Sequence, residues 1–125
     1  RHFARAALES VAYQTHDVIH AMAADSDVSL KEIRVDGGMV VNNWLLQFIA
    51  DTCNIIVERP TCIESTARGA AFLAALGAQF YQSLDDVTAM WQSQSVYQPS
   101  METAARLRYY KGWQQAVKSC CDYNS

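Results

Sequence analysis

The sequence predicts an α/β fold that is rich in helix, with a small sheet covered by helices. Two short segments that contain β-branched residues, 30–35 and 55–57, flank a segment with helical spacing of its apolar residues. Longer segments with helical spacing stand on either side, at residues 2–24, 66–80 and 101–119. Because a strand, a helix and a strand follow one another, we expect the two strands to pair in parallel.

The composition agrees with a globular domain and disfavours two kinds of partner. The 125 residues are 50% hydrophobic and 18% charged, which is enough apolar content for a core. The net charge is −3 and the ten basic residues are scattered, so we expect no nucleic-acid partner, since that affinity comes mainly from clustered Lys and Arg. The longest apolar run, residues 70–78, is too short to span a bilayer, and the first residues do not resemble a signal peptide. We therefore expect a cytoplasmic protein with no membrane partner.

The first predicted helix, over residues 2–24, is amphipathic. The apolar residues that recur at spacings of three, four and seven form one stripe, which we expect to be buried: Phe3, Ala7, Val11, Val18 and Met22. His16 and His20 stand four residues apart on the opposite side and could share a metal ion. No third ligand follows at helical spacing, so the sequence favours a solvated polar face and no metal site.

The strongest candidate for a ligand contact is the glycine pair Gly37 and Gly38. It lies between the end of a predicted strand and a helix start at Asn42 or Asn43. Without Cβ atoms, the glycines let the backbone approach a phosphate or nucleoside and adopt φ values that other residues resist. The helix start would direct unpaired N–H groups at that ligand, with the asparagine as cap and contact. A tight turn without a ligand is the alternative, because a glycine pair alone is a weak signal.

The remaining segments predict mainly structural elements. In the helix after the glycine pair we expect Leu45, Phe48 and Ile49 to face inward and Asn54 to form the C-cap. Small side chains dominate residues 66–80, which indicates a tightly packed core helix capped by Ser65 or Thr66. A short helix over residues 83–90 and an extended stretch to Pro99 follow. The last helix should bury one stripe: Leu107, Tyr110, Trp113, Ala116 and Val117.

The four cysteines show no metal-binding or redox spacing. They are Cys53, Cys62, Cys120 and Cys121. Because no C-x-x-C pair occurs, neither a zinc ribbon nor a thioredoxin-type site is indicated. We expect reduced thiols with a structural role.

Several stretches, in order along the chain, resemble a known enzyme family. They are residues 5–15, 35–43, 57–60 and 64–71. Together they resemble the C-terminal part of the FGGY carbohydrate kinases, and among these the bacterial glycerol kinases. The resemblance implies a partial ribonuclease H-like (actin-like ATPase) domain, with residues 1–125 forming one incomplete nucleotide-binding domain. Asp36 before the glycine pair favours the glycerol branch, since sister sugar kinases tend to carry a third glycine there.

The resemblance also implies an activity and a set of contacts. A longer parent protein would transfer phosphate from ATP, with Mg²⁺, to glycerol, giving glycerol 3-phosphate and ADP. In this chain the Gly38 backbone would lie against ADP and the Asn42 side chain would point toward the adenine end, with Gly37 permitting the approach. Asp36 would either brace the turn or take a direct role. In the family the catalytic aspartate and the glycerol-binding groups lie upstream, so no catalytic or metal-binding residue is assigned, and we expect the chain alone to be inactive.

Two other functions remain open from the sequence. The first is an FGGY kinase for another polyol or sugar, because the residues that select the acceptor would lie outside the chain. The second is a non-catalytic helical interaction module. Asp17, Glu58 and Asp85 are expected to be solvated charges or caps. Because an incomplete domain would expose apolar surface, we also expect a tendency to form a homo-oligomer.

Overall fold

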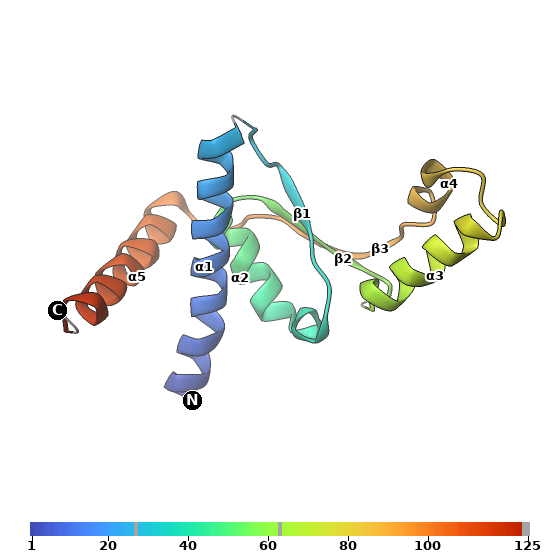
Figure 1. The fold of residues 1–125 in the computed structure, drawn as a ribbon. Helices are drawn as coiled ribbons and strands as arrows, with labels where there is room; N and C mark the ends of the chain where they lie inside the picture. The colour runs from blue at the N-terminus through green and yellow to red at the C-terminus, as the bar shows by residue number, and fades with distance from the viewer. Residues whose placement is uncertain (27, 63, 124–125) are drawn as a thin grey trace.

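The computed structural model describes residues 1–26, 28–62 and 64–123. Its elements in chain order are α1 (His2–Ser26), β1 (Glu32–Arg34), the 3₁₀ helix η1 (Gly38–Val41), α2 (Asn43–Cys53), β2 (Ile56–Pro60), α3 (Ser65–Gly77), α4 (Leu84–Thr88), β3 (Ser93–Tyr97) and α5 (Thr103–Tyr123). Figure 1 shows α1 and α2 side by side next to the sheet, with α5 on one side and α3 and α4 on the other. The predicted α/β class, rich in helix with a small sheet, is confirmed.

The sheet has three strands in the order β1-β2-β3. β1 and β2 pair in parallel, with Ile33 opposite Val57, which confirms the expected parallel pair. β3, expected only as extended chain, pairs antiparallel with β2, and the register shifts between Arg59 and Pro60. Both ends of the β1–α2–β2 unit are therefore fixed within one sheet.

Helix α2 supplies most of the core. The predicted inward residues Leu45, Phe48 and Ile49 are all buried, which confirms the spacing argument. Leu46 and Ala50 are buried as well, so α2 is enclosed on a broad face against α1 and the sheet. Complete burial of one leucine side chain contributes about 1.5–3 kcal/mol. Asn54 adopts the left-handed conformation, with φ 56° and ψ 42°, as expected of a C-cap.

The buried face of α1 is not the predicted one. Ala12 and Tyr13 are buried, whereas Phe3 is 94% exposed and Val18 and Met22 are exposed too. Ala12 has the small side chain that close contact with a second helix requires, and the Tyr13 ring packs edge-on against Phe48 with centroids 5.7 Å apart. Ala12 and Tyr13 thus determine which side of α1 packs. Of the predicted stripe only Val11 packs against the core, and it is partly buried.

Helix α3 was expected to pack tightly in the core, and this was wrong. None of its residues is buried, and Leu73 is 67% exposed. Figure 1 places α3 with α4 beyond the end of the sheet, away from α1, α2 and α5. Four of its half-buried residues line a cavity in that region: Ser65, Arg68, Gly69 and Phe72. Small side chains permit close packing, but they cannot specify the partner.

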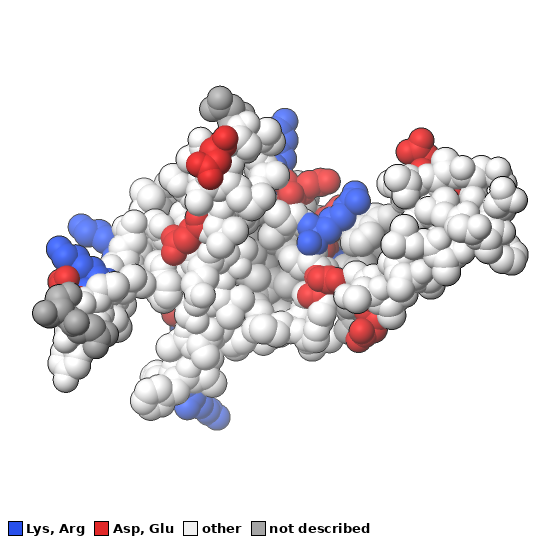
Figure 2. Space-filling model, in the orientation of Figure 1, with Lys and Arg blue, Asp and Glu red and all other residues white. Residues whose placement is uncertain are grey.

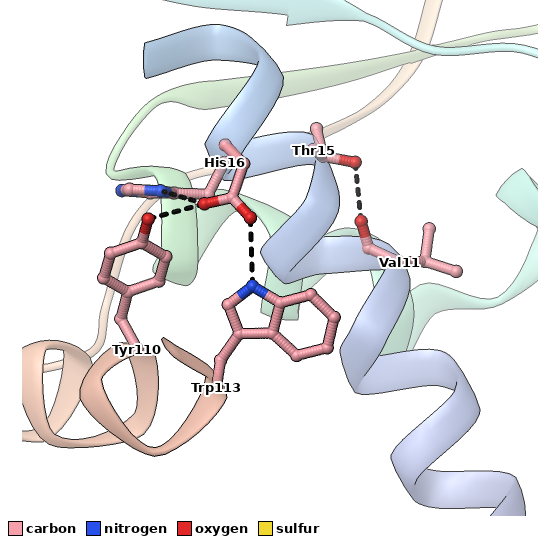
Figure 3. A network of polar contacts seen from close by, with 6 residues as sticks. Val11, Thr15, His16, Tyr110 and Trp113 are labelled. Carbon is pink, nitrogen blue, oxygen red and sulfur yellow. Dashed lines mark hydrogen bonds and ion pairs between the residues drawn. The ribbon is translucent and has the colours of Figure 1, made fainter. Parts of the chain in front are cut away.

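Helix α5 contacts α1 through only part of the expected stripe. Tyr110 and Trp113 are half-buried, but Leu107 is 60% exposed and Val117 is exposed as well. The Tyr110 hydroxyl donates to one carboxylate oxygen of Asp17, and Trp113 Nε1 donates to the other over 2.9 Å. Figure 3 shows both residues reaching from α5 toward α1. Polar contacts therefore orient α5 together with its aromatic residues.

The polar side of α1 is not simply solvated, contrary to the expectation. His16 is half-buried and lies against the Tyr110 ring, with centroids 4.2 Å apart. Asp17 is an acceptor for α5 and not only a solvated charge. Glu58 pairs with Arg34 across the sheet at 3.5 Å, so it too has a partner.

Candidate functional site

The glycine pair lies where β1 leaves the sheet. The Val35 N–H donates to the Glu58 carbonyl over 3.0 Å, which extends the parallel ladder by one residue beyond β1. Gly37 then adopts φ 87° and ψ 176°, a conformation that is essentially restricted to glycine. The sequence thus needs glycine at position 37 to turn the chain from the sheet into η1.

Gly38 differs from Gly37 in both conformation and surroundings. Its φ lies outside the left-handed region, and a Cβ atom built on it would meet no atom of the chain within 4 Å. Gly38 is exposed, while Val40 two residues later is buried and anchors η1 to the core. The space beside Gly38 is therefore open to a ligand, and the turn beneath it is held in place.

Asn42 joins η1 to α2 as the predicted N-cap. Its Oδ1 accepts a hydrogen bond from the Leu45 N–H at 3.2 Å, and its own N–H donates to the Met39 carbonyl at 3.2 Å. Within the described residues, no acceptor is bonded to the Nδ2 group of Asn42. Because capping uses only the oxygen, the amide donor remains available to a ligand at the positive end of the α2 dipole.

The Asp36 side chain forms no hydrogen bond with the turn in the part of the chain that the structure describes. Its side chain is exposed at the end of the ladder. The bracing role considered from the sequence is therefore not observed, and Gly37 and the η1 hydrogen bonds define the turn instead.

Arg59 is a residue of this site to which sequence reasoning gave no role. Its Nη1 donates to the Val40 carbonyl at 3.0 Å and to Asn43 Oδ1 at 2.8 Å, and its Nη2 donates to Ser95 Oγ at 3.0 Å. The alternation of side chains along a strand could have predicted its direction. Arg59 follows the buried Val57 by two residues, so both side chains point to the same face of the sheet. That face is the one covered by α2.

Asp51 is a nearly buried carboxylate with a structural role. It accepts hydrogen bonds from the backbone N–H groups of Ser100 and Met101, over 2.6 and 3.0 Å, and from Gln47 Nε2 over 3.1 Å. These donors hold the segment that leads into α5 against α2. Asp51 therefore has a structural role at the contact between α2 and the start of α5.

Cys53 and Cys62 are half-buried and form no disulfide. Burial raises the pKa of the Cys53 thiol to about 12, with a smaller contribution from the negative charge of Asp17. A thiol of this kind stays protonated and unreactive at neutral pH. Among the described residues no group of three or more His, Cys, Asp or Glu is placed to hold a metal ion.

A separate cavity of about 240 Å³ lies between β1, α3 and α4. Its lining includes Arg34, Arg68 and Trp91, and none of the glycines or asparagines of the turn. Both arginines are engaged, since Arg34 lies over the Trp91 ring at 4.6 Å and Arg68 donates to the Met90 carbonyl over 2.6 Å. The turn and this cavity are therefore distinct features.

Comparison with known proteins identifies the family. Residues 1–78 match the model of the FGGY family of carbohydrate kinases, C-terminal domain. Because this match covers more than half of the chain, the protein belongs to the FGGY carbohydrate kinases, as the sequence motifs indicated. In the described part of the chain, no helix has both the length and the apolar character needed to cross a membrane.

The most similar relatives include glycerol kinases. The chain is 51% identical over 118 residues to the glycerol kinase of Halalkalibacterium halodurans and 50% identical over 118 residues to that of Bacillus subtilis. Each alignment covers 94% of this chain and 24% of the relative, so the chain spans about a quarter of the length of these curated relatives.

Solved structures support the same fold. The crystal structure of Plasmodium falciparum glycerol kinase with ADP matches with a TM-score of 0.80 and 32% identity, over 92% of this chain and 23% of that chain. Xylulose kinase from Lactobacillus acidophilus, at 20% identity and a TM-score of 0.77, shares the fold over 95% of this chain and 24% of its own. The expected partial actin-like ATPase fold is confirmed by these neighbours.

Proposed function

We propose that this chain is part of an ATP-dependent glycerol kinase and forms the adenosine side of its nucleotide site. The observation that carries the proposal is the turn over residues 37–42, where Gly38 is open to solvent and the Asn42 amide donor is unused. Identity of about half with glycerol kinases favours glycerol over another polyol or sugar as the acceptor. The alternative of a non-catalytic interaction module is disfavoured by membership of a kinase family.

The residues at the turn fit the nucleoside end of ATP or ADP. The open Gly38 backbone allows a flat or polar group to approach closely, and the Asn42 Nδ2 group can donate to an acceptor on the base. The N-terminus of α2 adds a partial positive charge beside an anionic ligand. These groups bind and orient the nucleotide, and none of them moves a proton.

The groups that complete phosphoryl transfer belong to other parts of the proposed enzyme. Phosphoryl transfer needs charge neutralisation at the phosphates and a base for the attacking hydroxyl. The described residues offer no carboxylate cluster suited to Mg²⁺, so its ligands would be the nucleotide phosphates and residues outside this chain. We accordingly propose that glycerol and Mg²⁺ bind only in a longer protein, that the chain can self-associate, and that the enzyme is cytoplasmic.

Titration of the purified chain with MgADP by calorimetry tests the nucleotide site. A Gly38→Val variant fills the open space, and an Asn42→Ser variant keeps an oxygen for the α2 cap while removing the amide donor. Each should weaken binding about ten-fold, the size of effect that one lost polar contact or one steric block gives. Gly112→Val, at a glycine of α5 that also has open space around it, should bind as the unmodified chain does.

Two results would contradict the nucleotide proposal for this chain. One is no detectable binding by a chain that is folded by circular dichroism. The other is equal binding by all four proteins, which would place the nucleotide elsewhere. Separately, the chain alone should form no glycerol 3-phosphate from glycerol and MgATP, and measurable product would refute the assignment of the catalytic groups to other segments.

A further inference from the structure

Arg59 occupies a special position in the sheet. Arg34, the last residue of β1, pairs with Glu58, while Arg59 on β2 pairs with Ser95 on β3. Strand β2 therefore continues past the point at which β1 ends and the chain turns through Gly37. Its first residue beyond that point is Arg59, whose side chain lies on the α2 side of the sheet with that of Val57.

The guanidinium group of Arg59 joins three elements. It donates to the Val40 carbonyl in η1, to Asn43 Oδ1 at the first residue of α2, and to Ser95 Oγ on β3, over 2.8–3.0 Å. The group also lies 5.8 Å from the ring centre of Tyr97. The Tyr97 hydroxyl donates to the same Asn43 oxygen over 2.8 Å, so both side chains hold the start of α2.

These contacts are not explained by charge pairing. Among the described residues, the ion pairs are formed by Arg5, His16 and Arg34, and no carboxylate lies within 4 Å of the Arg59 nitrogens. Its Nε atom is buried without a hydrogen-bond partner in that part of the chain. Partial burial of an unpaired cation costs free energy, which its bonds to three neutral acceptors must offset.

We propose that Arg59 is a positioning residue for the nucleotide site. It clamps η1 and the start of α2 to the sheet, and this fixes residues 37–42 in the geometry that the nucleotide contacts. The planar, forked guanidinium can reach acceptors on three elements at once, which a lysine ammonium cannot. The inference rests on the proposed function, because it assumes that residues 37–42 bind the nucleotide. Arg59 would hold these residues in place without contacting the nucleotide itself.

The test uses the full 125-residue chain and three variants. Arg59→Met removes the donors and keeps much of the apolar stem, and Arg59→Lys keeps the charge without the fork. Arg106→Met is the matched control, since Arg106 donates to Asn54 Oδ1 at the opposite end of α2. Hydrogen exchange is measured at the N–H groups of Val40, Asn42 and Leu45, which form the hydrogen bonds of η1 and the α2 cap. MgADP affinity is measured on the same samples.

Both Arg59 variants should increase exchange at these amides and weaken MgADP binding by about ten-fold each, while Arg106→Met leaves both unchanged. Unchanged exchange in Arg59→Met would overturn the clamp, whatever the nucleotide does. Unmodified behaviour of Arg59→Lys would also overturn it, because charge alone would then suffice. If the unmodified chain binds no MgADP, the proposed function fails for this chain, while the exchange data still decide whether Arg59 holds the turn.

Discussion

Gly37 and Gly38 are adjacent and chemically identical, yet the fold depends on them differently. Gly37 has φ 87° and Gly38 does not lie in the left-handed region, while neither has an atom within 4 Å of an added Cβ. Gly37→Ala should therefore lower the free energy of unfolding through backbone strain alone, by about 1–3 kcal/mol. Gly38→Ala should change it by less than about 1 kcal/mol. Urea denaturation followed by circular dichroism measures both, and equal losses would refute the distinction.

The same residues indicate what sequence could and could not predict at the turn. The glycine pair and the capping asparagine were predictable, because left-handed φ values and helix caps favour particular residue types. Arg59 was not given a role, since its acceptors lie 16 to 36 residues away in the chain and only the folded sheet brings them together. The residues around Arg59 in the sequence do not indicate which groups accept its hydrogen bonds.

Asp17 links α1 to α5, and its removal should weaken that contact. Asp17→Ala leaves the Tyr110 hydroxyl and Trp113 Nε1 without their acceptor, at the half-buried α1–α5 contact. The loss in free energy of unfolding should be about 1–2 kcal/mol, below the full value for charged acceptors because the Asp17 side chain is 42% exposed. Asp25→Ala, at an exposed position of the same helix, serves as the control in urea denaturation. A loss no larger than that of the control would refute this account.

The contact between α1 and α5 should also respond to pH. Burial lowers the pKa of His16 below its usual 6.5. The positive charges of His20 and Arg106 lower this pKa further, while the negative charge of Asp17 raises it. A lowered folded-state pKa means that the unfolded chain takes up the proton first, so stability is complete above about 6.5 and falls on acidification below it. Urea denaturation between pH 7.5 and 5 should show this fall. His16→Gln should reduce the fall more than His20→Gln does, because burial is the larger cause of the shift and His20 a smaller one. Equal pH profiles for all three proteins would contradict this account.

Asp17 contributes to stability in a different pH range. Burial acts to raise the pKa of Asp17, but the hydrogen bonds from Tyr110 and Trp113, together with the neighbouring His16, outweigh it and hold the pKa below the usual 3.8. Its contribution is therefore present above that value and lost only in stronger acid. The two residues thus separate a first decline, below the usual His pKa of about 6.5, from a second one below the usual Asp pKa of 3.8.

Sequence patterns predicted most elements but not all of their buried faces. The face of α2 followed from Leu45 and Phe48, because apolar residues are concentrated on the side of that helix that faces α1 and the sheet. In α1 apolar residues occur on more than one side, and the buried side is set by contacts with α2 and with Trp113, a hundred residues away. In α3 the run of alanines fits any close partner equally well. The spacing of apolar residues predicts that a helix forms. Which side of the helix is buried depends on contacts with segments elsewhere in the chain.

The molecule as a whole leaves apolar side chains uncovered along α1. Phe3, Val18 and Met22 lie on one side of the helix and are exposed, and Val11 and Ile19 line a shallow cavity beside them. In the view of Figure 2 much of the surface is uncharged, with acidic and basic side chains in small separate groups. In relatives four times as long, further segments can cover such a face, and the 125 residues by themselves can bury it against a second copy.

We therefore expect concentration-dependent self-association through this side of α1. Val18→Lys places a charge in the exposed apolar stripe and should weaken association about ten-fold, because an unpaired ammonium would have to be desolvated at the interface. Ala24→Lys adds the same charge at an exposed position on another side of the helix and should leave association unchanged. Sedimentation equilibrium measures both. A chain that stays monomeric at high concentration would contradict the expected self-association. Equal weakening by both variants would show that association depends on net charge and not on the exposed apolar side of α1.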